Sequence, residues 1–222
     1  MSILYGILAL IMLFFIVLQI RNRIPRIISF FSPGKRNLSF QDQPDPPVDE
    51  IHMEMAKPLL EKMEAGGFKQ LGYMVEKAPL WSRSTRELVM VSASDKIIAS
   101  IGFRGLKSSY FLYTPFEGGQ VVITAHNCFR NYIKPDFMTT EVKSGDLDEM
   151  LESHKNDVES FIAKGYVPFR DYSREAVMRA TNQYYKSSYP ATQLRVAGVI
   201  NSLFFIVCLL IFYLLVRAAF SQ

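Results

Sequence analysis

Residues 2–20 read SILYGILALIMLFFIVLQI, and residues 196–216 read VAGVINSLFFIVCLLIFYLLV. Neither stretch contains a charged side chain or a histidine. As α-helices they would be roughly 28 and 31 Å long, close to the hydrocarbon thickness of a bilayer. Long uncharged runs of this kind are more typical of membrane spans than of buried core helices. The sequence therefore predicts one transmembrane helix within residues 1–20 and a second over residues 196–216.

A cleaved signal peptide is the alternative interpretation of the first stretch. Such a peptide has a basic segment before its apolar run and small residues at a cleavage site. Here no charged residue comes before the apolar run, and the basic sequence IRNRIPR follows it at residues 20–26. We therefore expect the first stretch to remain as an anchor.

Basic residues gather on the inner flanks of the two apolar runs. The residues expected at the membrane flank are Arg21, Arg23, Arg26, Lys35, Arg36 and Arg195. Arg217 stands alone beyond the second run. Short flanks rich in lysine and arginine stay in the cytoplasm. We therefore expect a two-pass protein of the inner, or cytoplasmic, membrane, with both termini outside the cytoplasm and residues 21–195 inside.

The formal net charge of +4 does not indicate a protein that binds nucleic acid. Six of the 25 lysine and arginine residues lie in residues 1–36 and 196–222, where there is no acidic residue. The remaining 19 are outnumbered by all 21 aspartate and glutamate residues, so the central part has a net charge of −2. A surface that binds DNA or RNA would need the opposite sign. The apolar runs contain no aspartate, glutamate, lysine, arginine or histidine, which argues against transport, although Gln19, Asn201 and Ser202 could hydrogen-bond between the helices.

A basic interfacial segment and a proline-rich linker are expected over residues 21–47, the linker reading QDQPDPP at its end. A cytoplasmic domain follows over residues 48–190. Its first helix has apolar residues at every fourth position: Ile51, Met55, Leu59 and Met63. Pro58 is expected to kink this helix or to split it.

From residue 68 to residue 125 the apolar pattern changes to a period of two, which is typical of strands. Five strands are predicted, around residues 71–75, 88–91, 97–103, 110–113 and 121–123. Turn residues separate them and no helix intervenes, which favours an antiparallel meander. Two helices follow, one capped by Asp146 and the other over residues 173–185. These elements predict an α+β domain with an antiparallel five-stranded sheet and helices packed on one face.

Residues 71–73 read LGY, residues 116–127 read FEGGQVVITAHN, and residues 154–168 read HKNDVESFIAKGYVP. In this layout, over residues 55–185, the chain resembles an uncharacterised group of bacterial membrane-tethered α+β proteins. The resemblance implies a tethered domain and no particular activity.

Three side chains offer the chemistry of a metal centre or of a nucleophile: His126, Cys128 and His154. His126 and Cys128 are two residues apart, so they would share one face of a strand, and with His154 they could supply three zinc ligands. Cys128 and His154 could also act as a nucleophile and its base. Their spacing matches no CxxC, HExxH or protease signature, and packed core side chains are the simpler interpretation. We therefore expect no catalytic residue, no metal and no cofactor.

Tyrosine and arginine residues gather in the last part of the domain. They are Arg170, Tyr172, Arg174, Tyr184, Tyr185 and Tyr189. Both residue types are enriched in protein interfaces, so we interpret this set as a partner interface. An aromatic belt at the membrane surface, combined with core packing, is the alternative.

The sequence favours a non-catalytic, membrane-anchored accessory or scaffold subunit of a larger integral membrane complex. Its expected partners are other membrane subunits and the bilayer, and an energy-transducing host, respiratory or photosynthetic, is compatible with it. A membrane-tethered cytoplasmic module that binds or senses a ligand is the first alternative, and it would need a concave pocket. An enzyme that uses His126, Cys128 or His154 is the second.

Overall fold

The computed structural model describes residues 2–31, 37–45, 47–77, 85–104, 107–126, 132–134, 137–186 and 188–220. The chain forms two compact units. The helical unit contains residues 1–35, 78–83 and 189–222, and the α+β domain contains residues 36–77 and 84–188. This division follows the composition, because uncharged apolar runs build the first unit and alternating apolar and polar residues build the second.

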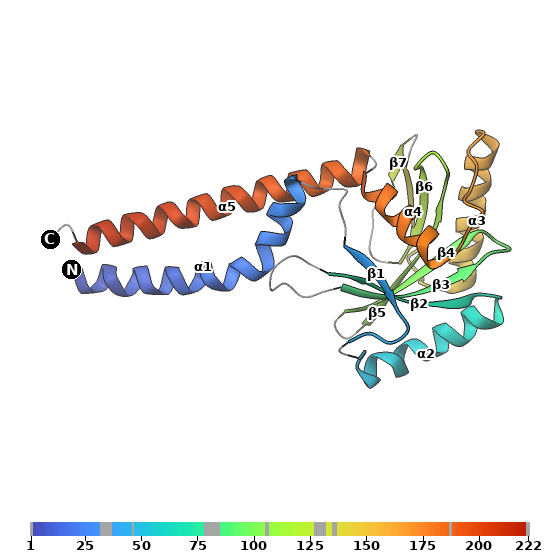
Figure 1. Ribbon diagram of the computed structural model, residues 1–222, viewed down its shortest axis with the longest axis horizontal. Coiled ribbons are helices and arrows are strands. Elements are labelled where there is room, and N and C mark those ends of the chain that lie inside the picture. The colour runs from blue at the N-terminus through green and yellow to red at the C-terminus, as the bar shows by residue number, and fades with distance from the viewer. Residues whose placement is uncertain are drawn as a thin grey trace. The chain divides into compact units, whose positions relative to one another are not determined.

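Two long apolar helices make up the described part of the helical unit. α1 spans Ser2–Phe31, and α5 spans Ser188–Phe220. Figure 1 shows them running in opposite directions, so that both ends of the chain lie at the same end of the pair. The windows Ile3–Ile20 and Thr192–Phe220 are long and apolar enough to cross a membrane, each with a mean hydropathy of 2.8. The two predicted apolar helices are therefore present, and both continue beyond the predicted spans.

A small set of contacts joins α1 to α5. The rings of Phe15 and Phe204 meet edge to face, with their centroids 6.2 Å apart. Arg23 donates to the side-chain oxygens of Asn201 at 2.9 Å and of Gln19 at 3.0 Å. Its guanidinium also lies 3.7 Å from the centroid of the Phe204 ring. Gln19 and Asn201, two of the expected inter-helix partners, are thus linked through Arg23, which fixes the register of the pair.

Eight strands form one mixed sheet in the described part of the α+β domain. Their bounds are β1 (Leu38–Gln41), β2 (Lys69–Glu76), β3 (Thr85–Ser92), β4 (Ile97–Arg104), β5 (Lys107–Pro115), β6 (Val121–Ala125), β7 (Tyr132–Lys134) and β8 (Phe137–Glu141). They lie in the order β1-β2-β3-β4-β5-β6-β8-β7, and every neighbouring pair is antiparallel except β6 and β8. The five predicted strands are confirmed as β2 to β6, but the prediction of an antiparallel five-stranded sheet is wrong.

The three strands missing from the prediction lie at the two ends of the sheet. β1 falls inside the segment expected to be interfacial or linker, and β7 has three residues. Strands this short carry little periodic signal. They form because the outer sides of β2 and β6 would otherwise present rows of unpaired backbone groups. β8 is parallel to β6 because the chain reverses twice between them, through β7.

Three helices cover both faces of the sheet: α2 (Glu50–Ala65), α3 (Leu147–Ala163) and α4 (Arg174–Lys186). Along β5, Tyr110 and Leu112 belong to the core that α2 and α3 cover, whereas Tyr113 meets Tyr184 of α4 across a cavity. Successive side chains of a strand point to opposite faces. α4 therefore packs on the face opposite α2 and α3, and the prediction of helices on one face is wrong. The sequence contained a signal for this second cover, because residues 88–91 of β3 read LVMV and residues 121–123 of β6 read VVI, and consecutive apolar residues indicate a strand that is buried on both faces.

A capping side chain begins α3, as the local sequence predicts. The Asp146 carboxylate accepts hydrogen bonds from the backbone N–H groups of Asp148 at 2.9 Å and Glu149 at 3.2 Å. Lys62 of α2 pairs with Asp146 at 3.2 Å and with Asp148 at 2.9 Å, which links the two helices. Pro58 lies inside α2 without interrupting it, so the helix is not split.

Candidate functional site

His154 is completely buried between α3 and the sheet. Its Nε2 lies 3.0 Å from the hydroxyl of Thr114 on β5, and its Nδ1 lies 2.9 Å from the hydroxyl of Thr124 on β6. Burial lowers the pKa of His154 to about 3, because a charged ring would lose its hydration. The imidazole is therefore neutral at physiological pH.

The hydrogen bonds around His154 also determine its tautomer. The Thr114 hydroxyl donates to the carbonyl oxygen of Lys96, at 2.7 Å, so it accepts from His154. Nε2 therefore carries the proton, and Nδ1 accepts from the Thr124 hydroxyl. Each donor in this series of hydrogen bonds has one acceptor. Neither ring nitrogen of His154 is therefore available to a substrate or a metal ion.

Of the other two candidates for catalysis or metal binding, the structure describes only His126. Nδ1 of His126 lies 3.1 Å from the carbonyl oxygen of Val142. Cys128 lies outside the described residues. Across the described ranges, no group of three or more histidine, cysteine, aspartate or glutamate side chains could hold a metal ion. The enzyme hypothesis therefore draws no support from the geometry around His154.

A cavity of about 270 Å³, here named the α4 cavity, lies between the sheet and α4. Its walls are mostly apolar, and they are formed by Leu38, Met74, Glu76, Thr85, Glu87, Phe111, Tyr113, Pro115, Val121, Ile123, Ala180, Thr181, Tyr184 and Tyr185. Ligand sites are typically concave and mostly apolar, with a few polar groups and volumes of about 300–1,000 Å³. The α4 cavity is close to the small end of that range, which suits a small molecule.

Small side chains on this face of the sheet help to leave the space open. The register places Glu87 of β3 opposite Gly102 of β4, and Ser100 of β4 opposite Phe111 of β5. Neither Gly102 nor Ser100 fills volume above the sheet as a leucine would. Ala180, which α4 contributes to the opposite wall, is small as well. Close packing is the rule in protein interiors, so facing small residues leave a hollow.

Two polar groups of the α4 cavity have distinctive surroundings. The Glu87 carboxylate accepts a hydrogen bond from the Ser100 hydroxyl at 2.6 Å, which holds the side chain in place. The Tyr113 hydroxyl is buried without a hydrogen-bond partner among the described residues. Its neighbour Thr181 donates to the carbonyl oxygen of Val177, at 2.9 Å. Burial, together with the nearby charge of Glu87, raises the pKa of Tyr113, so this phenol stays neutral.

The residues predicted as a partner interface occupy different environments. Arg174 donates to the carbonyl oxygen of Leu71 at 2.8 Å and pairs with Asp42, so it binds within its own domain. Tyr172 is buried, and the side chain of Tyr189 lies outside the described residues. Arg174 therefore holds the start of α4 against β1 and β2.

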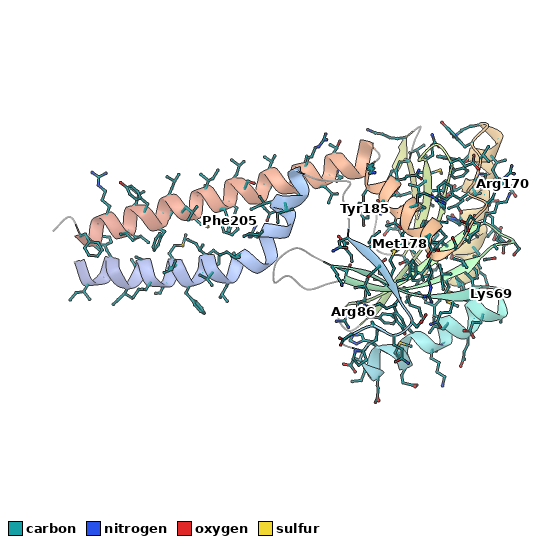
Figure 2. The ribbon with its side chains drawn as sticks, viewed as in Figure 1. Lys69, Arg86, Arg170, Met178, Tyr185 and Phe205 are labelled. Carbon is teal, nitrogen blue, oxygen red and sulfur yellow. The ribbon has the colours of Figure 1, made fainter. Side chains whose placement is uncertain are left out.

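The remaining predicted interface residues flank or end α4. Tyr184 packs on Phe137 of β8, with ring centroids 5.8 Å apart, and on Tyr185 at 5.0 Å. Arg170 is exposed and precedes the helix, whereas Tyr185 lies in its last turn (Figure 2). The twelve residues from Arg174 to Tyr185 span roughly 16 Å along α4, so these predicted interface residues do not form one compact patch.

The structure describes the side chains of two of the six predicted membrane-flank residues. Arg23 bonds Asn201, and Arg195 is exposed on α5. Lys35 and Arg36 lie outside the described residues, as do the side chains of Arg21 and Arg26.

No known family, curated protein or solved structure matches this chain. The resemblance to bacterial membrane-tethered α+β proteins stays a prediction. Inferences about function thus rest on the two apolar helices and on the α4 cavity. No pattern in the sequence predicted Phe111, Tyr113 and Glu87 as cavity residues. Four consecutive apolar residues at 110–113 were the available signal, because they indicate a strand with both faces covered.

Proposed function

We propose that this chain is a non-catalytic accessory subunit of a larger integral membrane complex, anchored in the cytoplasmic membrane by α1 and α5. The pair of apolar helices is the main observation that supports this proposal. Large apolar side chains on them are exposed in the single chain, for example Leu10 at 68%, Phe14 at 66% and Leu214 at 59%. In a bilayer such surfaces contact lipid or the helices of another subunit.

The arrangement of the anchors supports a role in assembly. One span would be enough to attach a domain to a membrane, and this chain has two. Their described contacts include a polar link between Arg23 and Asn201, which fixes how α1 and α5 pair. A paired anchor presents one defined apolar surface, which a partner's helices can recognise by packing.

The proposed topology places both termini outside the cytoplasm and the α+β domain inside. A reporter fused after Gln222 is expected to be active outside the cytoplasm, and one inserted after Asp45 inside it. Neutralising Arg21, Arg23 and Arg26 together should weaken this bias, because basic flanks hold a loop in the cytoplasm. Alkaline phosphatase fusions report positions outside the cytoplasm, and green fluorescent protein fusions report positions inside it. The reverse pair of signals would contradict the orientation.

The proposed complex can be tested by purification at native expression levels. Solubilisation in a mild detergent, followed by sizing and mass spectrometry, is expected to yield a stoichiometric membrane partner. Tyr185→Ala should weaken retention of that partner by roughly tenfold, because buried interface tyrosines often contribute more than 1 kcal/mol to binding. Lys69→Ala, at an exposed position of β2, is the matched control and should leave retention unchanged. A monomer or a simple homodimer would count against the proposal.

A second candidate function is a membrane-tethered module that binds a small molecule. The α4 cavity favours it, because its volume of about 270 Å³ is close to the lower limit for ligand sites and its mostly apolar walls carry a few polar groups, as those of ligand sites do. The two functions are compatible, since an accessory subunit can carry a ligand site. Saturable binding of a small molecule by the purified chain tests the second candidate independently of any partner.

A further inference from the structure

Two pairs of aromatic rings line opposite walls of the α4 cavity. Phe111 and Tyr113 come from β5, with ring centroids 5.8 Å apart, and Tyr184 and Tyr185 come from α4, with centroids 5.0 Å apart. The faces of such rings carry negative electrostatic potential and attract cations. Aromatic walls on two sides are the arrangement that proteins use to enclose an organic cation.

The charged members of the same walls are acidic. Glu76 and Glu87 are the ionisable carboxylates among the described lining residues, and that lining includes no lysine, arginine or histidine. Ser100 holds the Glu87 carboxylate in place at 2.6 Å. A bound molecule with a positive charge would therefore lie among four aromatic rings and near a fixed negative charge.

We propose that the α4 cavity binds a small alkylated ammonium ion of the quaternary or tertiary class. The methyl groups of such an ion match the apolar walls, and its charge matches the rings and Glu87. A metal ion would instead need a cluster of several carboxylate or imidazole ligands, and the described residues hold no group of three or more such side chains. This proposal rests on the second candidate function, and it does not depend on membership of a complex.

The test uses the full chain in maltoside micelles, with the methionine methyl groups labelled with carbon-13. Met74 lines the α4 cavity, and Met150 is buried in the core on the other face of the sheet. Titration with choline or tetramethylammonium should shift the Met74 methyl resonance saturably and leave that of Met150 in place. The uncharged isostere 3,3-dimethylbutan-1-ol should bind at least tenfold more weakly, because it has the same shape without the charge.

Two variants separate charge from shape. Glu87→Gln keeps an oxygen that can accept from Ser100 and should weaken choline binding at least tenfold. Glu54→Gln, on α2, is the matched control and should leave binding unchanged. Tyr185→Leu should also weaken binding, because leucine keeps the apolar bulk and removes the ring.

The same experiment distinguishes the sources of the cation. Saturation of the Met74 shift by free choline supports a soluble ligand, and saturation by added phosphatidylcholine, with no response to phosphatidylglycerol, supports a lipid headgroup. Either result supports the proposed chemistry. Equal binding of the uncharged isostere, or no shift of Met74 with any of these probes in a folded sample, would overturn it. Neither outcome bears on whether a protein partner co-purifies.

Discussion

Lowering the pH from 7 to 5 is expected to reduce the free energy of unfolding of the α+β domain by about 2 kcal/mol through His154 alone. Burial lowers the pKa of His154 to about 3 in the folded state, whereas an unfolded histidine titrates near 6.5. Between these values the unfolded state binds one more proton than the folded state. Stability therefore rises with pH in this window, by about 1.4 kcal/mol per unit.

The His154→Gln variant tests whether His154 causes this pH dependence of the free energy of unfolding. Glutamine cannot take up a proton in this range, so the variant's stability should change less between pH 7 and pH 5 than the wild type's. Thermal unfolding of the detergent-solubilised chain, followed by near-ultraviolet circular dichroism, reads the domain separately from the helical content of α1 and α5. The same pH dependence in the variant would mean that another group is responsible.

Replacing His154 by leucine should destabilise the domain at pH 7 by about 2–4 kcal/mol, because the buried hydroxyl of Thr124 then loses its acceptor. The double change His154→Leu with Thr124→Val should recover part of this loss. Removing both partners of a buried hydrogen bond costs less than removing one. A double variant as unstable as His154→Leu would show that lost packing, and not the unpaired hydroxyl, is the cause.

Gly72→Ala is expected to destabilise the domain by about 3 kcal/mol, because two effects add at this position. The backbone of Gly72 has φ +127, which side chains rarely adopt, and lies at an irregularity in the pairing of β2 with β3. An added Cβ would also lie 3.0 Å from the carbonyl oxygen of Gln41 and 3.0 Å from the Arg174 guanidinium. It would thus push against β1 and against the side chain that ties α4 to the sheet.

Gly67→Ala is the matched control for Gly72→Ala. Gly67 also has a positive φ, of +85, but an added Cβ there would meet nothing within 4 Å. The Gly67→Ala variant should therefore lose about 1 kcal/mol of stability, from the backbone conformation alone. Chemical denaturation of both variants measures the difference. Equal losses would show that the contacts with Gln41 and Arg174 do not matter.

The sequence by itself determined the elements that depend on local pattern. Uncharged runs at residues 2–20 and 196–216 predicted the apolar helices, now seen as α1 and α5. Alternation predicted β2 and β4, short runs of strand-forming residues predicted β3, β5 and β6, and a capping aspartate predicted the start of α3. These features are readable because periodicity, caps and turn residues act over a few neighbouring positions.

The tertiary structure decided how those elements are arranged and what they enclose. β1, β7 and β8 are strands because an open sheet edge was there to pair with, which no short segment encodes alone. α4 lies opposite α2 and α3 because the sheet is apolar on both faces and each face needs a cover. For the same reason His154 became a core residue between two threonines, and Glu87, Phe111 and Tyr185 came together around a cavity. Contacts between residues tens of positions apart depend on register and on which face is free, and local sequence specifies neither.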